Sequence, residues 1–273
     1  MAQTPSKQQA KRISARERIQ EAQRIEQAAS KRRQRIVVAV SAVAVLALAG
    51  GAAVAINSAS GKKDSTAAAD AAAPTELVLP ANASGPDGTV ITYGKADAPH
   101  TMEVYEDFRC PVCKHFEAAN GEAVKKLTED GSVKVEFHLA AFLDNALGGK
   151  GSRTALAAAG AALNEGVDKF KQFHDVLYAN QPDERKDDFG NVNHILDLAG
   201  QVPGLKTDAF VKAVTDKTYA PWAAKVAEAF NGSGVTGTPT VKVDGKPITL
   251  FSGQSTVTPE QFTAQVKQAA GLK

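Results

Sequence analysis

The sequence predicts an α/β domain that contains a helical insertion and follows one N-terminal transmembrane helix. Three observations support this prediction. Residues 36–56 form an uncharged apolar run. Two strand patterns, at 101–108 and 133–139, flank a helical pattern that begins at the only two cysteines of the chain. A stretch of helical character, about 148–234, then separates these strands from a C-terminal hairpin and helix.

The first 35 residues form a basic arm, with ten Lys or Arg residues against three Glu, although the whole chain has a net charge of only +2. The following 21 residues, 36–56, are long enough to span a hydrocarbon core, which needs about 20 helical residues. Because the basic residues precede this run, the positive-inside rule places the arm in the cytoplasm and the rest of the chain outside it. The alternative is a cleaved signal peptide, cut at a triplet such as 53–55. Either interpretation exports both cysteines.

The basic arm is therefore interpreted as a topology signal that also lies near anionic membrane lipid, and not as a nucleic-acid-binding segment. Residues 57–88 are rich in Ala, Ser, Asp, Pro and Gly and contain few large apolar side chains. Such a composition predicts a flexible extracytoplasmic linker. We expect the folded domain to cover residues 89–273.

The domain begins with a short strand pattern at 89–93, followed by the strand at 101–108 and a helix that ends near 130. The strand at 133–139 alternates apolar with polar residues. A strand, a helix and a second strand with a short return predict a right-handed unit in which the two strands are parallel.

The helical insertion is expected to contain four segments, with Ser152 as a candidate N-cap. These segments are 154–163, 167–179, 192–199 and 208–230, the last interrupted at Pro221. A strand at 240–243, an Asp-Gly turn at 244–245 and a partner strand at 247–251 predict a hairpin. A closing amphipathic helix is predicted to begin near Thr258.

Cys110 and Cys113 enclose Pro111 and Val112 and stand where the strand at 101–108 gives way to the helix. Such a C-x-x-C pair after a strand indicates redox chemistry. A sulfur at a helix start lies beside unpaired backbone N–H groups, which favour the thiolate. Cys110 is therefore the expected attacking sulfur and Cys113 the resolving one. The alternatives are a static structural disulfide and half of a zinc site with His115, which lacks a second pair of ligands.

Two acidic residues, Glu106 and Asp107, precede the cysteines, and either could relay a proton to or from Cys113. Alternation along a strand points them to opposite faces, so at most one lies under the motif. Asp107 is slightly favoured, and solvated strand-end acids are the alternative. His115 is expected at the surface, whereas His138 and His174 are expected to be structural. Trp222 is expected to pack between helices.

Several motifs together resemble the DsbA-like thioredoxin-fold family, and in particular its membrane-anchored members from Gram-positive bacteria. The resemblance covers about residues 86–273 and lies in the segments 106–113, 150–153, 173–174, 181–183 and 237–240. It implies a thioredoxin fold with an inserted helical domain. It also implies that Pro239 is a cis-proline facing the cysteines and that Thr238 offers backbone groups to a substrate peptide. Several strongly oxidising relatives have histidine where this chain has Val112, so we expect a milder oxidant.

The sequence thus predicts a membrane-anchored, extracytoplasmic thiol:disulfide oxidoreductase whose redox-active disulfide joins Cys110 and Cys113. The expected substrates are exported proteins that are reduced or unfolded. Disulfides persist outside the reducing cytoplasm, which fits an extracytoplasmic location. Turnover requires a membrane redox partner, for which a quinone-linked oxidase is expected, but no metal and no organic cofactor. A disulfide reductase or isomerase and a tethered redox-sensing or binding module are the alternatives.

Overall fold

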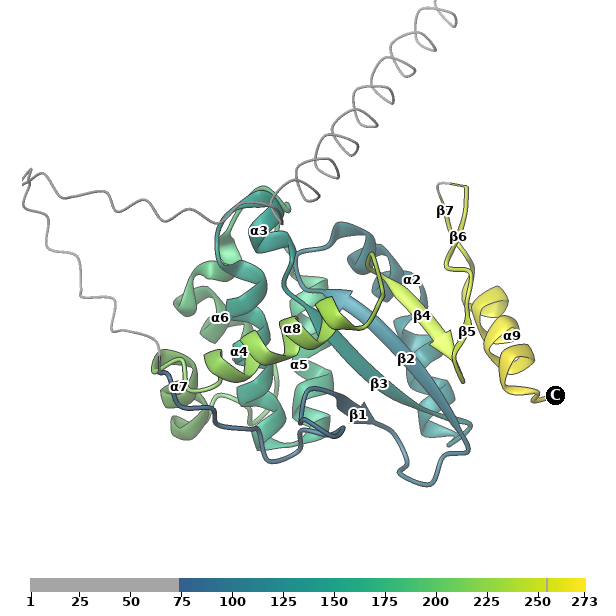
Figure 1. Cartoon of the computed structure of the whole chain (residues 1–273), viewed down its shortest axis with the longest axis horizontal. Coiled ribbons are helices and arrows are strands. Elements are labelled where there is room, and N and C mark those ends of the chain that lie inside the picture. Colours follow the sequence, from purple (N-terminus) through teal and green to yellow (C-terminus); the bar gives the residue numbers. More distant parts are fainter. Residues whose placement is uncertain (1–73, 254) are drawn as a thin grey trace, which may run out of the picture. The chain divides into compact units, whose positions relative to one another are not determined.

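The computed structural model of the chain describes residues 74–253 and 255–273 (Figure 1). The basic arm (1–35), the apolar run (36–56) and the first part of the predicted linker lie outside the described residues. In the part that is described, no helix combines the length and the apolar character that crossing a bilayer would require.

The centre of the domain is a five-stranded mixed sheet with the order β1-β3-β2-β4-β5. The strands are β1 (Ile91–Tyr93), β2 (His100–Asp107), β3 (Val133–Ala140), β4 (Thr240–Val243) and β5 (Lys246–Pro247). β2 and β3 are parallel and are connected by helix α2 (Pro111–Glu129), whereas the other strand pairs are antiparallel. The predicted parallel unit around the cysteines is confirmed.

The remaining helices either join β3 to β4 or follow the sheet. They are α3 (Leu143–Leu147), α4 (Gly151–Glu165), α5 (Val167–Ala179), α6 (Val192–Ala199), α7 (Asp208–Thr215), α8 (Ala220–Gly232) and α9 (Pro259–Ala270), with a 3-10 turn at Asp188–Gly190. A small separate ribbon consists of β6 (Phe251–Ser252) and β7 (Ser255–Thr256).

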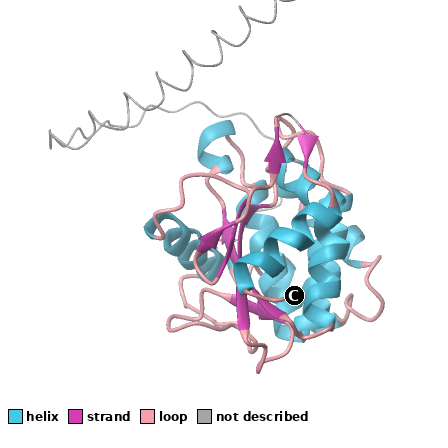
Figure 2. Ribbon diagram, turned by 90° about the vertical axis from the view of Figure 1, so that its right-hand side faces the viewer, coloured by secondary structure: helices cyan, strands magenta, loops and turns pink. Residues whose placement is uncertain are grey.

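Helices pack on both faces of the sheet, and β2 is therefore buried on both sides. In α2, Phe116 packs against Phe262 of α9, with ring centroids 5.7 Å apart. On the opposite face Tyr105 of β2 packs against Phe230 of α8, at 6.2 Å. Figure 1 shows α8 passing in front of the strands while α2 lies behind them, and Figure 2 shows the strands between helices. Successive residues of a strand point to opposite faces, and because both faces are covered Tyr105 is buried as well as Val104.

Two local predictions in the helical segment were wrong in part or in full. The predicted interruption of the helix at 208–230 is present, but it lies between Thr215, which ends α7, and Ala220, which begins α8, and not at Pro221. Pro221 occupies the first turn of α8, where a backbone N–H has no partner within the helix and proline is therefore tolerated. Ser152 is not an N-cap but lies inside α4, and its hydroxyl donates to Asp107 at 2.6 Å. A tertiary partner has taken the hydroxyl that the sequence assigns to a local cap.

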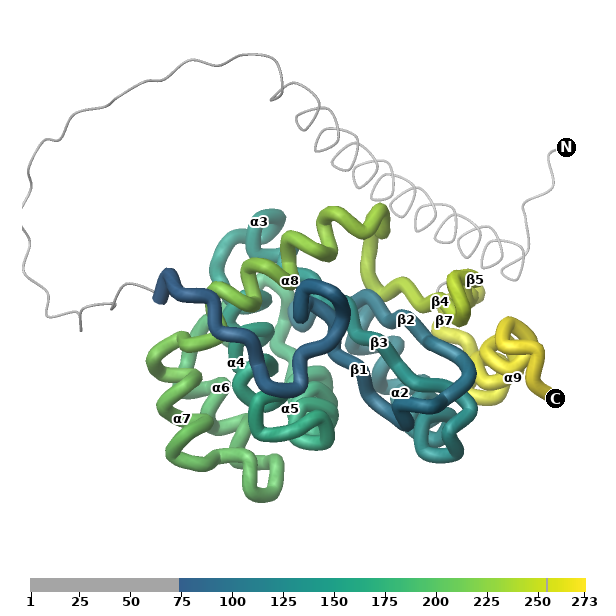
Figure 3. Tube along the Cα trace, turned by 60° about the horizontal axis from the view of Figure 1, so that its bottom comes forward, coloured from purple at the N-terminus to yellow at the C-terminus, as the bar shows by residue number. Residues whose placement is uncertain are grey.

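Residues before the predicted linker boundary at residue 88 already make contacts with the folded domain. The Asn82 side-chain amide donates to the Leu163 carbonyl oxygen of α4 at 2.8 Å. The Trp222 indole N–H donates to the Gly88 carbonyl oxygen at 2.6 Å. Figure 3 follows this segment past α7 and α8 to β1. Composition could not reveal these contacts, because the partners come from helices about 80 and 130 residues away in the chain.

At the C-terminal end the Asp-Gly turn and the closing helix are confirmed. Asp244 and Gly245 both have positive φ angles, 48° and 76°, as a two-residue hairpin turn requires. The capping box of Thr258 and Gln261 begins α9. The expected strand at 247–251 is shorter than predicted, because the backbone N–H of Thr249 donates to a side chain of α9 instead of continuing the ladder.

Candidate active site

Cys110 lies at the junction of β2 and α2. It is the N-cap residue of α2, with φ −75° and ψ 114°, and Pro111 occupies the first helical position. The Cys110 backbone N–H donates to the Asp107 carbonyl oxygen at 2.8 Å, which fixes the turn between strand and helix. Both cysteines are free thiols. Only 6% of the surface of Cys110 is exposed, and Cys113 is fully buried.

The surroundings of Cys110 favour its thiolate. They lower its pKa from 9.0 to about 6, chiefly through a hydrogen bond from the Cys113 side chain. The backbone N–H groups of Val112 and Cys113 lower the pKa further, whereas burial opposes the shift. Cys110 is therefore mostly ionised at neutral pH. A thiolate of this kind is both a nucleophile and a good leaving group.

Cys113 has the opposite character. Burial raises its pKa well above the ordinary value, and the hydrogen bond to Cys110 and the charge of Glu106 raise it further. The two sulfurs of one motif thus differ in the direction of their pKa shifts, as the positions at the helix start and one turn inside it predict. When a disulfide between them opens, Cys113 needs a proton and Cys110 does not.

The loop before β4 faces Cys110. The Thr238–Pro239 peptide bond is cis, the conformation that the resemblance implies. The Cys110 sulfur lies 3.5 Å from the Thr238 carbonyl oxygen, to which it donates when it is protonated. Beside the sulfur, Val112 has 42% of its surface exposed and offers an apolar contact to an incoming chain. The structure therefore places the carbonyl group before the cis-proline against Cys110, with Val112 exposed two residues further along the chain.

Glu106 and Asp107 are both fully buried, so the alternative of solvated strand-end acids is wrong. The Asp107 carboxylate accepts from the backbone N–H groups of Arg109 and Leu143 and from the Ser152 hydroxyl, at 3.0, 3.2 and 2.6 Å. These bonds make Asp107 a structural residue of the turn. Which of the two acids relays a proton stays a prediction: the charge of Glu106 raises the pKa of Cys113, whereas a hydrogen bond from the Asp107 backbone lowers it.

Glu106 pairs with a histidine from the helical segment. The Glu106 carboxylate lies 3.1 Å from Nε2 of His174, and both side chains are fully buried. Burial raises the pKa of Glu106 to about 8, with a further contribution from the charge of Glu117. His174 was expected to be structural. Its full burial and its contact with Glu106 agree with that expectation.

Three groups with potential metal ligands lie in this cluster. Ligand atoms of Glu106, Glu117 and His174 are within 4.8 Å of one another. The nearby Lys171 side chain is 7% exposed, and its ammonium is 2.5 Å from Asp175. The carboxylates thus already have an imidazole and an ammonium as internal counterions.

A second set of contacts clamps the turn before Cys110. The Gln181 side-chain amide donates to the carbonyl oxygens of Phe108 and Cys110, at 2.8 and 2.9 Å. The buried Arg109 guanidinium donates to Asp144 at 2.8 Å. These residues were missed as site residues. Gln181 belongs to a segment that carries the family resemblance, and that was the one signal available for it.

The other singled-out residues lie where the sequence placed them. His115 is exposed on α2. His138 stacks on Tyr105 with ring centroids 4.5 Å apart. Trp222 is fully buried between helices, and its edge lies so close to Gly160 of α4 that a Cβ there would approach it to 2.6 Å.

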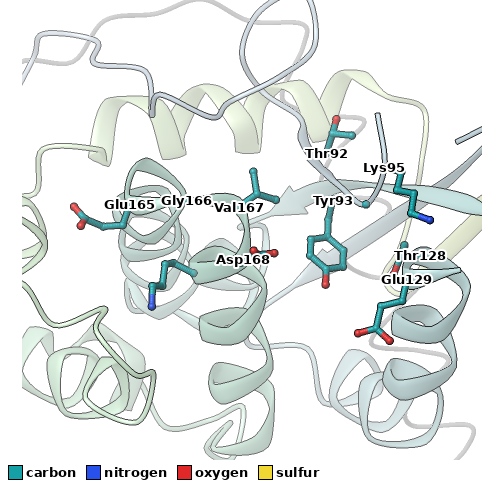
Figure 4. Close-up of a pocket in the computed structure, with 11 residues that line it drawn as sticks. Thr92, Tyr93, Lys95, Thr128, Glu129, Glu165, Gly166, Val167 and Asp168 are labelled. Atoms are coloured by element: carbon teal, nitrogen blue, oxygen red, sulfur yellow. The ribbon is translucent and has the colours of Figure 1, made fainter. Parts of the chain in front are cut away.

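A cavity of about 510 Å³ lies away from the cysteines (Figure 4). Tyr93, Lys95, Glu129 and Asp168 are among the residues that line it. Glu129 ends α2, whereas Cys110 precedes its first residue, so the helix separates the cavity from the sulfurs. The cavity contains neither cysteine and is not the redox site.

Comparisons with known proteins agree with this site. The family profile described as thioredoxin matches residues 87–268. The chain belongs to the thioredoxin family. Disulfide bond formation protein D from Bacillus subtilis (strain 168) is 31% identical over 163 residues, which cover 58% of this chain and 69% of that relative. The chain is a DsbA-like thiol:disulfide oxidoreductase.

Solved structures give the same result. The reduced form of DsbA from Mycobacterium tuberculosis is 27% identical with a TM-score of 0.54, covering 73% of this chain and 90% of that chain. The reduced form of the disulfide bond oxidoreductase DsbG from the same organism is 28% identical with a TM-score of 0.55, covering 73% and 86%. The predicted thioredoxin-like α/β fold of this oxidoreductase is therefore confirmed.

Proposed function

We propose that this oxidoreductase introduces disulfides into exported proteins on the extracytoplasmic side of a membrane. The observation that carries the proposal is the opposite tuning of the two sulfurs, Cys110 with a pKa lowered to about 6 and Cys113 with a raised pKa. Stabilising Cys110 as a thiolate stabilises the reduced enzyme, which makes its disulfide oxidising. The names of the relatives, which refer to disulfide bond formation, support the same direction.

The reaction is an exchange between dithiol and disulfide, with Cys110 and Cys113 as the catalytic residues. A substrate thiolate attacks Cys110 of the oxidised enzyme, a mixed disulfide forms, and Cys113 leaves and takes up a proton. A second substrate thiol loses its proton and attacks the substrate sulfur of the mixed disulfide. Cys110 leaves as a thiolate, the substrate gains a disulfide, and two electrons have passed to the enzyme.

The cis-proline loop binds the substrate in this scheme. Thr238 and Pro239 lie against Cys110, and the chain next to them continues into β4, so the backbone there can pair with an extended peptide. Pro111 fixes the helix start that holds Cys110. Val112 carries no charge or hydrogen bond to the thiolate through its side chain, so we expect a milder oxidant than relatives with histidine there.

The location and the recycling partner follow from the N-terminal sequence. Residues 36–56 would anchor the chain, with the basic arm (1–35) in the cytoplasm near anionic lipid and with the linker after residue 57 carrying the domain. A membrane quinone-linked oxidase would then reoxidise the Cys110–Cys113 pair, and the anchor would keep the two proteins close.

Reoxidation of a reduced, unfolded test protein tests this function. We expect many disulfides per enzyme when an oxidant is supplied, and loss of this turnover in Cys110→Ala. Consumption of one enzyme disulfide per enzyme molecule, without turnover, would support a redox sensor. In intact cells the pair should be mostly a disulfide, whereas a mostly reduced pair would indicate a reductase or isomerase. Because the chain has only two cysteines, labelling by a membrane-impermeant thiol reagent after reduction also reports which side they occupy.

A further inference from the structure

Three side chains from different elements meet where the sheet and two helices pack together. Glu106 comes from β2, Glu117 from α2 and His174 from α5. One potential ligand atom of each lies within 4.8 Å of those of the other two. A tetrahedral zinc ion with bonds of about 2.0–2.1 Å separates its ligand atoms by about 3.3 Å. Small rotations of the three side chains would therefore close them around an ion.

The imidazole of His174 is held in the orientation that a metal ligand needs. Its Nδ1 lies 3.1 Å from Asp175, and its Nε2 lies 3.1 Å from Glu106. An N–H at Nδ1 that is donated to Asp175 leaves the lone pair on Nε2, the atom that faces Glu106. Histidines that bind metals generally donate their other ring N–H to a carboxylate in this way. The Lys171 ammonium, 2.5 Å from the same oxygen of Asp175, keeps that acceptor in place.

Two buried oxygen atoms at this cluster lack partners. Glu106 Oε1 and the Tyr178 hydroxyl form no hydrogen bond within the part of the chain that the structure describes, although neither residue is more than 2% exposed. Tyr178 follows His174 by one helical turn, and the two ring centroids are 4.9 Å apart. A buried polar group without a partner is costly, and it indicates a bound water or ion. An ion bound by Glu106 would satisfy its unpaired oxygen.

A second cavity, between α2 and α5, gives access to the cluster. It has a volume of about 350 Å³, and its lining includes Glu117, Asp175 and Tyr178. The Asp175 side chain is 49% exposed, so the cavity is open to solvent. Gly121 lines it as well, and a Cβ there would approach Oε2 of Glu117 to 3.0 Å. The glycine thus leaves room for the carboxylate, and an ion can enter beside it.

The charges of the cluster match a divalent cation. Glu106, Glu117 and Asp175 contribute three negative charges when they are ionised, and Lys171 contributes one positive charge. With a neutral His174 imidazole the sum is therefore −2. The ammonium and the imidazole described above compensate only part of the carboxylate charge. A divalent ion bound to the neutral imidazole brings the sum to zero, and buried charges are stable only when they are compensated.

We propose that Glu106, Glu117 and His174 bind one Zn²⁺ ion, with Asp175 as the outer partner of His174 and with water from the cavity in the fourth position. Carboxylate oxygens and an imidazole nitrogen around an open position are donors that suit zinc. Ca²⁺ and Mg²⁺ prefer oxygen ligands alone and should bind weakly. The ion joins β2 and α2 to the helical segment. The site contains neither cysteine, so it goes beyond the proposed function and does not depend on it.

Zinc binding by the oxidised full-length chain tests the site. The disulfide form is used because a thiolate, and not a disulfide, is a metal ligand. The protein is purified in detergent without an affinity tag, freed of metal with a chelator and titrated with Zn²⁺. Calorimetry gives the affinity, and elemental mass spectrometry counts the ions per chain. We expect one ion per chain with a dissociation constant below about 1 μM, and no comparable binding of Ca²⁺ or Mg²⁺.

Three variants change the site and two do not. Glu117→Gln and His174→Gln should each weaken Zn²⁺ binding about 100-fold or more, because one of only three protein ligands is lost. Asp175→Asn should weaken it about 10–100-fold, as removal of an outer partner does. Glu122→Gln is the matched control, since Glu122 also lies on α2 and lines the same cavity but is outside the ligand cluster. His115→Gln, on the exposed side of α2, controls for zinc bound by a surface histidine. Both controls should match the wild type.

Glu117→Gln and Asp175→Asn change side chains that reach the cavity, so they keep the test decisive even if the buried His174→Gln variant is unstable. Wild-type zinc affinity in these two variants would overturn the inference, as would a wild-type chain that binds no zinc. An equal loss in Glu122→Gln or His115→Gln would assign the ion to the surface and would also overturn it. Because the measurement needs no turnover, failure of the proposed function is seen separately, as turnover that persists in Cys110→Ala.

Discussion

The sheet with α2 and the helical segment α3–α8 contribute to the same pair of sulfurs in different ways. The sheet and α2 act mainly through the backbone: the turn after β2 sets Cys110 at the helix start, and the loop before β4 brings Thr238 against it. The helical segment acts through side chains, with Gln181 clamping two carbonyl oxygens and His174 meeting Glu106. Backbone geometry survives most substitutions, whereas each side-chain contact depends on one residue.

The largest effect is expected in the first region, at the sulfurs themselves. Cys113→Ser should form a long-lived mixed disulfide with a substrate protein that contains a disulfide, because the Cys110 thiolate attacks that disulfide, one substrate sulfur leaves as a thiol, and no enzyme thiol remains to resolve the product. Cys110→Ser should form none, since Cys113 is buried and its pKa is raised. Non-reducing gels of each variant after incubation with substrate distinguish the two. Equal trapping by both variants would contradict the assigned roles.

The next effect concerns the ion pair that joins the two regions. Arg109→Met should destabilise the protein by about 3 kcal/mol, because the buried Asp144 carboxylate loses its buried cation and keeps only the half-exposed Arg153. Denaturation by urea measures this loss. Arg185→Met is the control, since the Arg185–Asp183 pair is exposed and should contribute at most about 1 kcal/mol. Equal losses would show that burial of the pair has no importance.

The reduced protein should gain stability relative to the oxidised one as pH rises from 6 to 8.5. Its Cys110 pKa is about 6 in the folded state against 9.0 for the ordinary thiol, so the folded state favours the thiolate. A lowered pKa contributes stability above the unfolded value and loses it as pH falls through the folded value. The expected gain is about 3 kcal/mol over this range. Urea denaturation of both redox forms measures it, and a flat difference would contradict the thiolate.

A smaller effect is expected at the clamp. Gln181→Leu should cost about 1–3 kcal/mol, because the carbonyl oxygens of Phe108 and Cys110 lose their donor. The rate of disulfide exchange should fall as well, since the turn that holds Cys110 loosens. Gln201→Leu is the matched control on the exposed surface and should have little effect. Wild-type exchange in Gln181→Leu would show that the backbone alone holds the turn.

Much of the fold could be read from local patterns. The strand and helix around Cys110 and Cys113, the helices at 167–179 and 192–199, and the capped helix after Thr258 all agree with the structure. These elements carry strong periodicity or end signals. The errors at Ser152 and at the start of the domain have a common cause: a partner distant in the chain decided the outcome. At Pro221 the cause is local, since proline is accommodated in the first turn of a helix.

The sequence by itself determined the chemistry of the motif and its place at a helix start. The spacing of Cys110 and Cys113 within one helical turn and the direction of the helix N–H groups are both local properties, so no distant contact is needed to predict them. Only the tertiary structure decided that the Asp107 carboxylate accepts from Ser152 and that Glu106 pairs with His174. Glu106 and His174 are separated by 68 residues in the chain. Their contact exists only because α5 packs against the sheet and α2, and no local pattern encodes that contact.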